Sequence, residues 1–308
     1  MTAEVGPIAE AVEVLRAGGL VGFPTETVYG LGADAANPAA LQRLFAVKGR
    51  PTDHPVIVHV ARAAQLDELG RDVPDVAHVL ATACWPGPLT LVVRRRADRV
   101  AAAATGGRDT VGIRVPDHPV AIALLDAFGE GIAAPSANRF GRVSPTTAQH
   151  VRDDLGTDVD LVLDGGPSAV GVESTIVDVT GERPVILRVG GIPDARLAEL
   201  VGGRLAHRTS GEVAAPGTLP SHYAPNARVE LVAAESVEAR AGHLRAEGLK
   251  VGVLDAPSDA GDYARSLYHR LRALDRDGVD VILAVPPDAA EGIAAAVADR
   301  LRRAASAR

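Results

Sequence analysis

Apolar and polar residues repeat along the first two-thirds of the chain with the periods of short buried strands and amphipathic helices. The apolar positions of segment 8–15 share one helical face, and a pair of glycines ends that pattern. The apolar run 20–23 predicts a buried strand that a proline closes. Asn37 followed by Pro38 suits the N-cap and the first helical position, and so predicts the start of the next helix.

Further elements follow with the same two periods. Helices are predicted near 74–83, near 120–128 and from the Ser144–Pro145 pair onward, and strands near 56–60, 89–94, 111–115, 161–163, 174–179 and 185–189. Some of these strands follow each other directly, whereas others are separated by a helix. This mixture predicts an α/β fold with a mixed rather than an all-parallel sheet.

The periodic pattern stops between residues 206 and 227, where Gly, Pro, Ser and Thr replace large apolar residues, as is typical of a linker. Beyond it, strands predicted near 229–232, 251–254 and 281–285 alternate with helices near 237–246, 263–274 and 289–305. The repeated strand–helix order predicts a small parallel, Rossmann-like domain. We therefore expect a first domain over residues 1–205, a linker over 206–227 and a second domain over 228–308.

Composition narrows the class of protein. Of 308 residues, 47% are hydrophobic and 23% are charged, and no run of eighteen apolar residues occurs, which excludes a membrane-spanning and a disordered chain. The net charge of −7 argues against a general attraction to nucleic acid or anionic lipid, although a local basic cleft could exist. The single Cys84 excludes a disulfide framework. The first residues show no secretory signal, so we expect a cytoplasmic protein.

Common nucleotide and zinc motifs do not account for this sequence. No G-x-x-x-x-G-K-[ST] pattern occurs, which excludes a P-loop, and no H-E-x-x-H or histidine cluster indicates a zinc site. Residues 30–35, GLGADA, match the letters of the dinucleotide motif G-x-G-x-x-A. However, the predicted strand ends too far before them, and the next helix begins beyond them. A loop that tolerates glycine is therefore the better interpretation of this segment.

Two segments carry candidate ligand-binding groups. Residues 23–32, FPTETVYGLG, place hydroxyls, a carboxylate and glycines after a strand, which suits either a ligand loop or an ordinary turn. Lys48 and Arg50 stand between a helix and a strand, and Lys48 is one of two lysines in the chain. The pair could clamp a pyrophosphate, with the lysine as a point charge and the arginine as a fork. A lone basic pair at a helix C-terminus is more often simply solvated.

Three later segments add groups that could hold an anion. Arg114 stands in an otherwise apolar strand and so requires an anionic partner, either a structural carboxylate or a substrate carboxylate. Residues 134–138, APSAN, end a strand, and residues 141–147 open a helix whose free N–H groups suit an anion, with Ser144 as N-cap. Residues 171–178, GVESTIVD, form a glycine loop that leads into a strand.

Together these segments resemble the YrdC-like threonylcarbamoyl-AMP synthases in their long, two-domain form. PTETVYGLG, KGRP, IRVP, PSAN with SPTTA, and GVESTIVD occur in the order and spacing of that family. Segment 217–225 resembles its His-Tyr-Ala-Pro linker, and residues 264–275 resemble part of its second domain. The resemblance covers nearly the whole chain. It implies the fold of the family, a YrdC-like mixed, twisted sheet with helices, followed by the smaller parallel α/β domain.

The resemblance implies a nucleotidyltransferase, an L-threonylcarbamoyladenylate synthase. It would join L-threonine, bicarbonate and ATP into threonylcarbamoyl-AMP and release pyrophosphate, for the threonylcarbamoyladenosine modification of tRNA. Matched motif by motif, the threonine-site residues are Thr27, His59, Arg114, Ala134 and Ser174. The ATP-site residues are Arg50, His54, Thr110, Ser136, Asn138, Ser144, Arg188 and Tyr223, and the expected catalytic residues are Lys48 and Arg50.

The resemblance also implies a metal and partners. Mg²⁺ would be held mainly through the ATP phosphates, with no metal ligands expected from the protein. Lys48, Arg50 and the metal would neutralise the leaving pyrophosphate, Arg114 would hold the threonine carboxylate, and Tyr223 would close over the nucleotide. Proteins that transfer the threonylcarbamoyl group to tRNA are expected downstream partners. We treat tRNA itself as a further candidate and expect no membrane partner.

Some positions depart from the family pattern, and two alternative functions stay open. His54 and Asp299 stand where asparagine is usual, and Ser221 replaces a basic residue. The same fold without adenylation activity could bind RNA or tRNA, although the acidic chain and its few aromatic residues argue against this. A carbamoyl-transferring enzyme would need further catalytic domains, which this sequence does not show.

Overall fold

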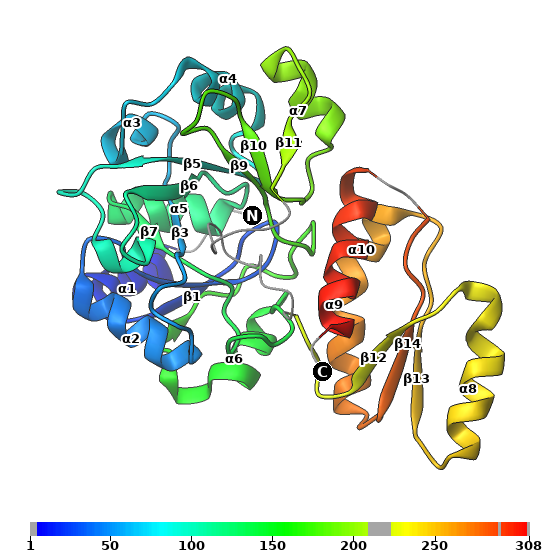
Figure 1. The fold of residues 1–308 in the computed structure, drawn as a ribbon. Helices are drawn as coiled ribbons and strands as arrows, with labels where there is room; N and C mark the ends of the chain where they lie inside the picture. The colour runs from blue at the N-terminus through cyan, green and yellow to red at the C-terminus, as the bar shows by residue number, and fades with distance from the viewer. Residues whose placement is uncertain (1–4, 209–222, 289–290, 307–308) are drawn as a thin grey trace.

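The computed structural model describes residues 5–208, 223–288 and 291–306, in which a larger and a smaller unit lie side by side (Figure 1). The strands of the larger unit are β1 (Val21–Phe23), β2 (Gly30–Asp34), β3 (Ile57–His59), β4 (Gly70–Arg71), β5 (Leu89–Arg95), β6 (Thr110–Arg114), β7 (Ile132–Ala133), β8 (Leu161–Val162), β9 (Thr175–Asp178), β10 (Val185–Arg188) and β11 (Ala206–His207). Its helices are α1 (Val5–Arg16), α2 (Pro38–Lys48), α3 (Gln65–Leu69), α4 (Asp75–Cys84), α5 (Pro119–Phe128), α6 (Ala148–Leu155) and α7 (Asp194–Val201). The smaller unit alternates β12 (Arg228–Leu231), α8 (Val237–Ala246), β13 (Val251–Leu254), α9 (Ala260–Arg276), β14 (Val281–Ala284) and α10 (Gly292–Ala305).

The sheet of the larger unit is mixed, as the sequence predicts. Its strand order is β11-β10-β9-β5-β6-β3-β7-β2-β1-β8, and β4 also pairs with β5. The pairs β5–β9, β3–β6, β1–β8 and β10–β11 are parallel, whereas the other neighbours are antiparallel. The three strands of the smaller unit are parallel in the order β12-β14-β13, which confirms the predicted strand–helix repeat. Figure 1 shows α9 and α10 on the side of that sheet toward the larger unit.

The larger unit carries its own apolar cores on the two faces of its sheet. One face packs against α2, α3 and α4 through side chains such as Leu44, Leu66 and Leu80. The other face packs against α1 and α5 through Leu15 and Leu124. Every fully buried member of these two clusters precedes residue 198. Burial of this kind is the main stabilising contribution to a domain, so the larger unit does not depend on the smaller one for a core.

A further apolar cluster joins the two units. It consists of the core side chains of α9, α10 and the small sheet, together with Tyr223 and with Val28, Val143 and Val172 of the larger unit. The three valines come from the segments that the sequence singles out as candidate ligand loops. The smaller unit therefore packs directly behind those loops.

The segment that begins at Gly30 differs from its prediction as a loop, because it is strand β2. It pairs antiparallel with both β1 and β7. Gly32 lies against the ring of Phe23, and a Cβ there would stand 2.9 Å from Phe23 Cε1 and from Ile132 Cγ2. The glycine is thus required by close packing within the sheet, which a sequence pattern does not distinguish from a flexible loop.

The helix predicted from Ser144–Pro145 begins later, at Ala148, and its N-cap is Thr147. The Thr147 hydroxyl accepts a hydrogen bond from the His150 N–H at 3.2 Å. Ser144 instead donates its hydroxyl to Glu173 at 2.6 Å, so it is unavailable as a cap. The prediction that Ser144 caps this helix is therefore wrong, whereas its expected role toward ATP stays a prediction.

The predicted linker region 206–227 has structured ends. Ala206 and His207 form β11, which pairs in parallel with β10. At the other end, Tyr223 is buried and the Ala224 N–H donates to the Gly141 carbonyl at 2.8 Å. Residues 209–222, which include Ser221, lie outside the described residues.

Candidate functional site

A pocket opens where the loops of the larger unit meet the end of the linker. It encloses about 550 Å³, part of it open to solvent, which falls within the range of small-molecule sites. Its lining is Thr25, Thr27, Val28, Gly30, Arg50, Ile57, His59, Arg114, Ala134, Pro135, Ser136, Glu173, Ser174, Arg188 and Tyr223. Most of these residues lie in or next to β2, β3, β6, β7, β9 and β10, so a rigid sheet fixes their positions.

Arg114 lies at the end of β6, opposite His59 of the parallel strand β3. Its Nη2 forms an ion pair with Glu26 Oε1 at 2.6 Å, and both side chains are buried. Its Nη1 donates to Thr27 Oγ1 at 2.9 Å, and its Nε donates to the Gly87 carbonyl at 3.2 Å. Of the two partners left open by the sequence, the structural carboxylate is therefore present. An amino-acid carboxylate bound here would share the guanidinium with Glu26.

His59 supplies a neutral polar group beside Arg114. Burial, together with the nearby Arg114 charge, lowers the pKa of His59 to about 3. The imidazole consequently carries no charge at neutral pH. Its ring packs edge-on against Phe23, with 6.0 Å between the ring centroids. At this end of the pocket, one cation and one neutral imidazole thus stand side by side.

Two further guanidinium groups line the other part of the pocket. Arg50 donates to the Pro55 carbonyl at 2.8 Å and to the His54 carbonyl at 3.2 Å, and burial lowers its pKa to about 10. Arg188 donates through Nη2 to Ser174 Oγ at 3.0 Å. With Arg114, these residues give the pocket a mainly cationic lining. Such a lining suits an anionic ligand such as a phosphate or a carboxylate.

Glu173 is the carboxylate of the pocket lining, and its oxygens are surrounded by donors. Oε1 accepts from the Ser144 hydroxyl at 2.6 Å, and Oε2 accepts from the Tyr268 hydroxyl and from Arg300 Nε, each at 2.9 Å. Burial alone would raise the pKa of Glu173, but Arg300 and Arg188 outweigh it and hold the pKa at about 2. The carboxylate is therefore ionised throughout the physiological range.

The structure brings together most of the residues that the sequence assigns to the site. All five residues expected at the threonine site line the pocket, namely Thr27, His59, Arg114, Ala134 and Ser174. Of those expected at the ATP site, Arg50, Ser136, Arg188 and Tyr223 line it as well. Their roles toward a ligand stay predictions.

The remaining expected residues lie behind or beside this lining. Lys48 is buried, and its ammonium donates to the carbonyls of Ser136 and Asn138. Asn138 donates through Nδ2 to the carbonyls of Arg139 and Arg142, and Ser144 contacts Glu173.

Two expected ATP-site residues lie apart from these contacts. Thr110 lines a smaller neighbouring cavity of about 300 Å³ that shares Ile57 with the main pocket. The His54 ring packs edge-on against Phe140, with 5.6 Å between the ring centroids.

Sequence reasoning misses several groups at the site. Thr25, Val28, Gly30, Ile57, Pro135 and Glu173 also line the pocket, and Glu26 pairs with Arg114. Glu26 could have been found, because a buried arginine demands a carboxylate and the PTETVYGLG segment offers one. Glu173 gives no comparable signal, since the residues that contact its Oε2 lie in the smaller unit.

Two kinds of feature are absent from residues 5–208, 223–288 and 291–306, which the structure describes. No group of three or more His, Cys, Asp or Glu side chains is placed there to hold a metal ion. None of the described helices combines the length and the apolar character that a membrane span requires.

Comparisons with known proteins agree with this geometry. Residues 13–190 match the Sua5/YciO/YrdC family model, described as "Telomere recombination", and residues 192–306 match the C-terminal domain of threonylcarbamoyl-AMP synthase. A threonylcarbamoyl-AMP synthase of Pyrococcus abyssi is 41% identical over 96% of this chain and 92% of its own length. One of Bacillus subtilis is 40% identical over 98% and 93%.

The fold agrees with a solved structure as well. The crystal structure of P. abyssi Sua5 complexed with L-threonine superposes with a TM-score of 0.92 at 41% identity, covering 98% of this chain and 94% of that one. The two family matches and this superposition together cover both units of the chain. The chain belongs to the Sua5/YciO/YrdC family, in the form that carries the C-terminal domain of threonylcarbamoyl-AMP synthases.

Proposed function

We propose that this chain is an L-threonylcarbamoyladenylate synthase, which forms threonylcarbamoyl-AMP and pyrophosphate from L-threonine, bicarbonate and ATP. The observation that carries the proposal is the composition of one pocket. It gathers the five expected threonine residues and four of the expected ATP residues around three guanidinium groups. The relatives that match nearly the full chain are threonylcarbamoyl-AMP synthases, and one of them is complexed with L-threonine.

The threonine end of the pocket is assigned to Arg114 and its neighbours. The guanidinium binds the threonine carboxylate, and Glu26 and Thr27 fix its direction through the contacts at 2.6 and 2.9 Å. Neutral His59 can exchange hydrogen bonds with threonine without adding a second charge there.

The nucleotide end is assigned to Arg50 and Arg188. Their charges compensate the ATP phosphates and the departing pyrophosphate, and carbonyl or hydroxyl acceptors hold both in place before substrate binds. Lys48 acts as a positioning residue, because its ammonium bonds the backbone on both sides of the 136–138 turn rather than lining the pocket.

The cationic lining of the pocket also affects how Mg²⁺ could bind there. Arg50, Arg114 and Arg188 would repel a bare divalent cation but attract the phosphates that carry it. We therefore propose that Mg²⁺ enters with ATP and is held mainly by phosphate oxygens. When bound, it would supply additional charge compensation at the phosphates.

The proposed reaction requires the protein to orient its substrates and does not require a covalent intermediate with the protein. The threonine amine attacks the carbon of bicarbonate or of CO₂ and becomes a carbamate, with loss of water when bicarbonate reacts. A carbamate oxygen then attacks the α-phosphorus of ATP, and pyrophosphate leaves with the electron pair of the broken P–O bond. The pocket holds the two substrates next to each other and balances their charge, which can supply a large part of the rate enhancement. The product would pass to proteins that transfer its threonylcarbamoyl group to tRNA.

The test is pyrophosphate release by the purified chain with ATP, L-threonine, bicarbonate and Mg²⁺. Release should require all three substrates. Arg50→Ala should lower the rate on the order of 100-fold because a preorganised charge is lost. The matched control is Arg99→Ala, which removes an exposed arginine paired with Glu130 and should keep the wild-type rate. Release that is unaffected by omitting threonine or bicarbonate would contradict the proposal. A salt-dependent tRNA complex with no turnover would support the RNA-binding alternative instead.

A further inference from the structure

Two side chains of the smaller unit reach the wall of the pocket without lining it. Tyr268 of α9 and Arg300 of α10 are both fully buried. Each donates to Glu173 Oε2 at 2.9 Å, and Glu173 lines the pocket. The carboxylate therefore reaches between the two units, with one oxygen held by Ser144 of the larger unit and the other by the smaller unit.

The same two side chains also contact Tyr223, the other pocket-lining residue at this wall. The rings of Tyr223 and Tyr268 stack with 5.8 Å between centroids and 26° between planes. The Arg300 guanidinium lies 5.4 Å from the centroid of the Tyr223 ring, within the range of a cation–π contact. Tyr223 has a backbone φ of 63°, which an L residue rarely adopts, so these contacts help to hold an unfavourable conformation.

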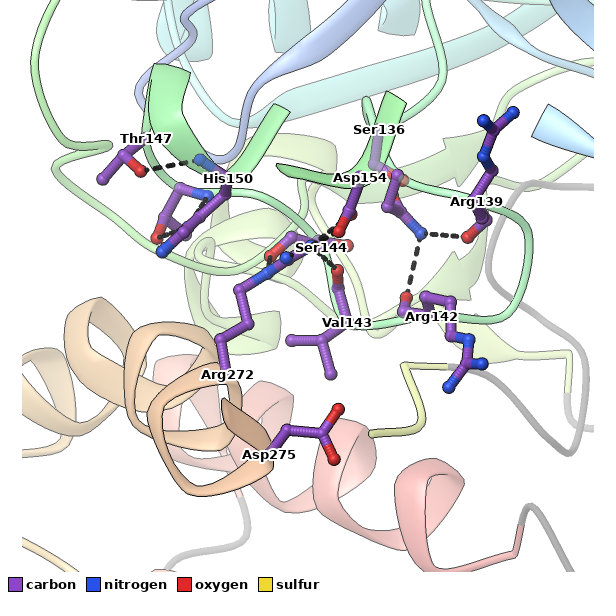
Figure 2. A network of polar contacts seen from close by, with 12 residues as sticks. Ser136, Arg139, Arg142, Val143, Ser144, Thr147, His150, Asp154, Arg272 and Asp275 are labelled. Atoms are coloured by element: carbon purple, nitrogen blue, oxygen red, sulfur yellow. Dashed lines mark hydrogen bonds and ion pairs between the residues drawn. The ribbon is translucent and has the colours of Figure 1, made fainter. Parts of the chain in front are cut away.

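A second set of contacts fixes how α9 lies against the larger unit (Figure 2). Arg272 donates to the carbonyl of Val143 and pairs with Asp154 at 2.5 Å. Asp275, one turn further along, accepts from the N–H groups of Asn226 and Ala227 at 2.8 and 3.0 Å. Helix α9 is thereby tied both to the segment that contains Ser144 and to the end of the linker.

We propose that Tyr268 and Arg300 are positioning residues of the adenylation reaction, which hold Glu173 and Tyr223 in the wall of the pocket. This inference rests on the proposed function. Under this proposal the smaller unit contributes to the active site, because two of its side chains hold residues of the pocket wall without lining the pocket themselves.

The charges explain why an arginine is needed at position 300. Glu173 lies within electrostatic reach of Arg188, a pocket residue assigned to the phosphates. Arg300 compensates the Glu173 charge from the far side, so Arg188 keeps its charge available for an anionic ligand. Without Arg300, Glu173 would compete with the substrate for Arg188, or would take up a proton at a higher pH.

The test measures adenylate formation by the full chain in variants of both residues. Tyr268→Phe removes one hydroxyl and keeps the ring against Tyr223. Its kcat/KM should fall on the order of 10-fold, because a hydrogen bond to a charged group is lost. Arg300→Met should lower kcat/KM on the order of 100-fold and raise KM for ATP. It should also move the acid limb of the pH profile to higher pH, and Arg300→Lys, which keeps the charge, should move that limb back.

Matched control variants distinguish a loss of activity caused by lost positioning from one caused by lost stability. Tyr263→Phe removes a buried hydroxyl from the same helix, one that donates to the Val285 carbonyl at 2.8 Å. Arg303→Met removes an arginine from α10 that pairs with Asp299 at 2.9 Å. Both should keep kcat/KM within about two-fold. Thermal unfolding of every variant checks the fold, and Tyr268→Phe decides the matter if Arg300→Met does not fold.

Two outcomes would overturn the inference. One is an active wild type whose Tyr268→Phe variant has unchanged kcat/KM and an unchanged pH profile. The other is an equal loss in Tyr268→Phe and Tyr263→Phe, since the Tyr263 hydroxyl donates to the Val285 carbonyl, which does not line the pocket. A wild type that makes no adenylate at all would instead contradict the proposed function itself.

Discussion

At the scale of single residues, the pocket is built from charges that are compensated before any substrate binds. Arg114 shows this most clearly, since Glu26, Thr27 and the Gly87 carbonyl surround its guanidinium. A buried ion pair of this kind adds little net stability, but losing one partner costs about 3–5 kcal/mol because the other is left uncompensated. The pair is thus better explained as a device that orients the guanidinium.

Replacing Arg114 should affect the binding of threonine and the binding of ATP differently. We expect Arg114→Ala to weaken threonine binding on the order of 100-fold, the effect of a lost charge-assisted bidentate pair, and to change ATP binding far less. Calorimetric titration with each ligand measures this. Because Glu26 is left unpaired, the double variant Glu26→Gln/Arg114→Ala should regain stability without regaining threonine affinity. Equal losses for both substrates would contradict the assignment.

His59 should leave a signature in the pH dependence of stability. The folded chain keeps His59 neutral down to about pH 3, whereas the unfolded chain binds a proton near its ordinary pKa of 6.5. The unfolded state therefore holds more protons between these values, so stability falls as pH drops below 6.5, by about 1.4 kcal/mol per pH unit. Between pH 7 and pH 5, His59→Gln should remove about 2 kcal/mol of this loss in denaturant titrations. Identical pH dependence in both proteins would contradict a buried neutral histidine.

At the scale of elements, the end of α2 holds the turn that carries Ser136. Lys48, the last residue of α2, donates to two carbonyls of that turn and is buried. Burial, and secondly the charge of Arg50, lowers its pKa well below the ordinary value, yet its two carbonyl acceptors are suited to an ammonium donor. The helix and the turn are thus joined through one side chain.

The two lysines of the chain provide a matched pair for testing this joint. Lys48→Met should lower the free energy of unfolding by about 3 kcal/mol, since the carbonyls of Ser136 and Asn138 both lose their donor. Lys250→Met removes an exposed ammonium that donates to the Asp277 carbonyl, and should cost less than about 0.5 kcal/mol. Denaturant midpoints of the two variants give the comparison. A similar shift in both would show that Lys48 is not a joint between the helix and the turn.

The same elements show how far sequence reasoning reaches. The strand–helix repeat of the smaller unit was predictable, because each strand is a short apolar run and each helix has one apolar face. The start of α6 was not, since Ser144 and Thr147 are both good N-caps and Glu173, distant in sequence, takes the Ser144 hydroxyl. Most residues that line the pocket were also predictable, because the motifs that carry them occur in the order of the family. The placement of Glu173 did not, because Tyr268 and Arg300 lie 95 and 127 residues away.

At the scale of the whole molecule, the larger unit holds the pocket and the smaller unit supports one wall of it. The two main cores of the larger unit contain no residue of the smaller one. The joining cluster, in contrast, brings Tyr223 and α9 against Val28, Val143 and Val172. We therefore expect folding and activity to respond differently to removal of the second unit.

A chain truncated after Ala206 should fold but lose most of its adenylate yield. Its cores remain, whereas Tyr223 and the donors from Tyr268 and Arg300 to Glu173 are gone. A cooperative unfolding transition together with the product yield tests both halves of this statement. Tyr223→Ala in the full chain keeps the tether, and should also lower the yield of intact adenylate. A wild-type yield of adenylate from both proteins would mean that neither the linker nor the second unit is needed for the reaction.

The most direct measurement is mass spectrometry of the product formed from ATP, L-threonine and bicarbonate labelled with carbon-13. The pocket described here should join all three substrates. We therefore expect threonylcarbamoyl-AMP that carries the label, formed in the same amount as pyrophosphate and absent when any one substrate is omitted. Folded protein that binds ATP and threonine but yields only AMP or ADP, or an adenylate without the label, would contradict the proposed reaction.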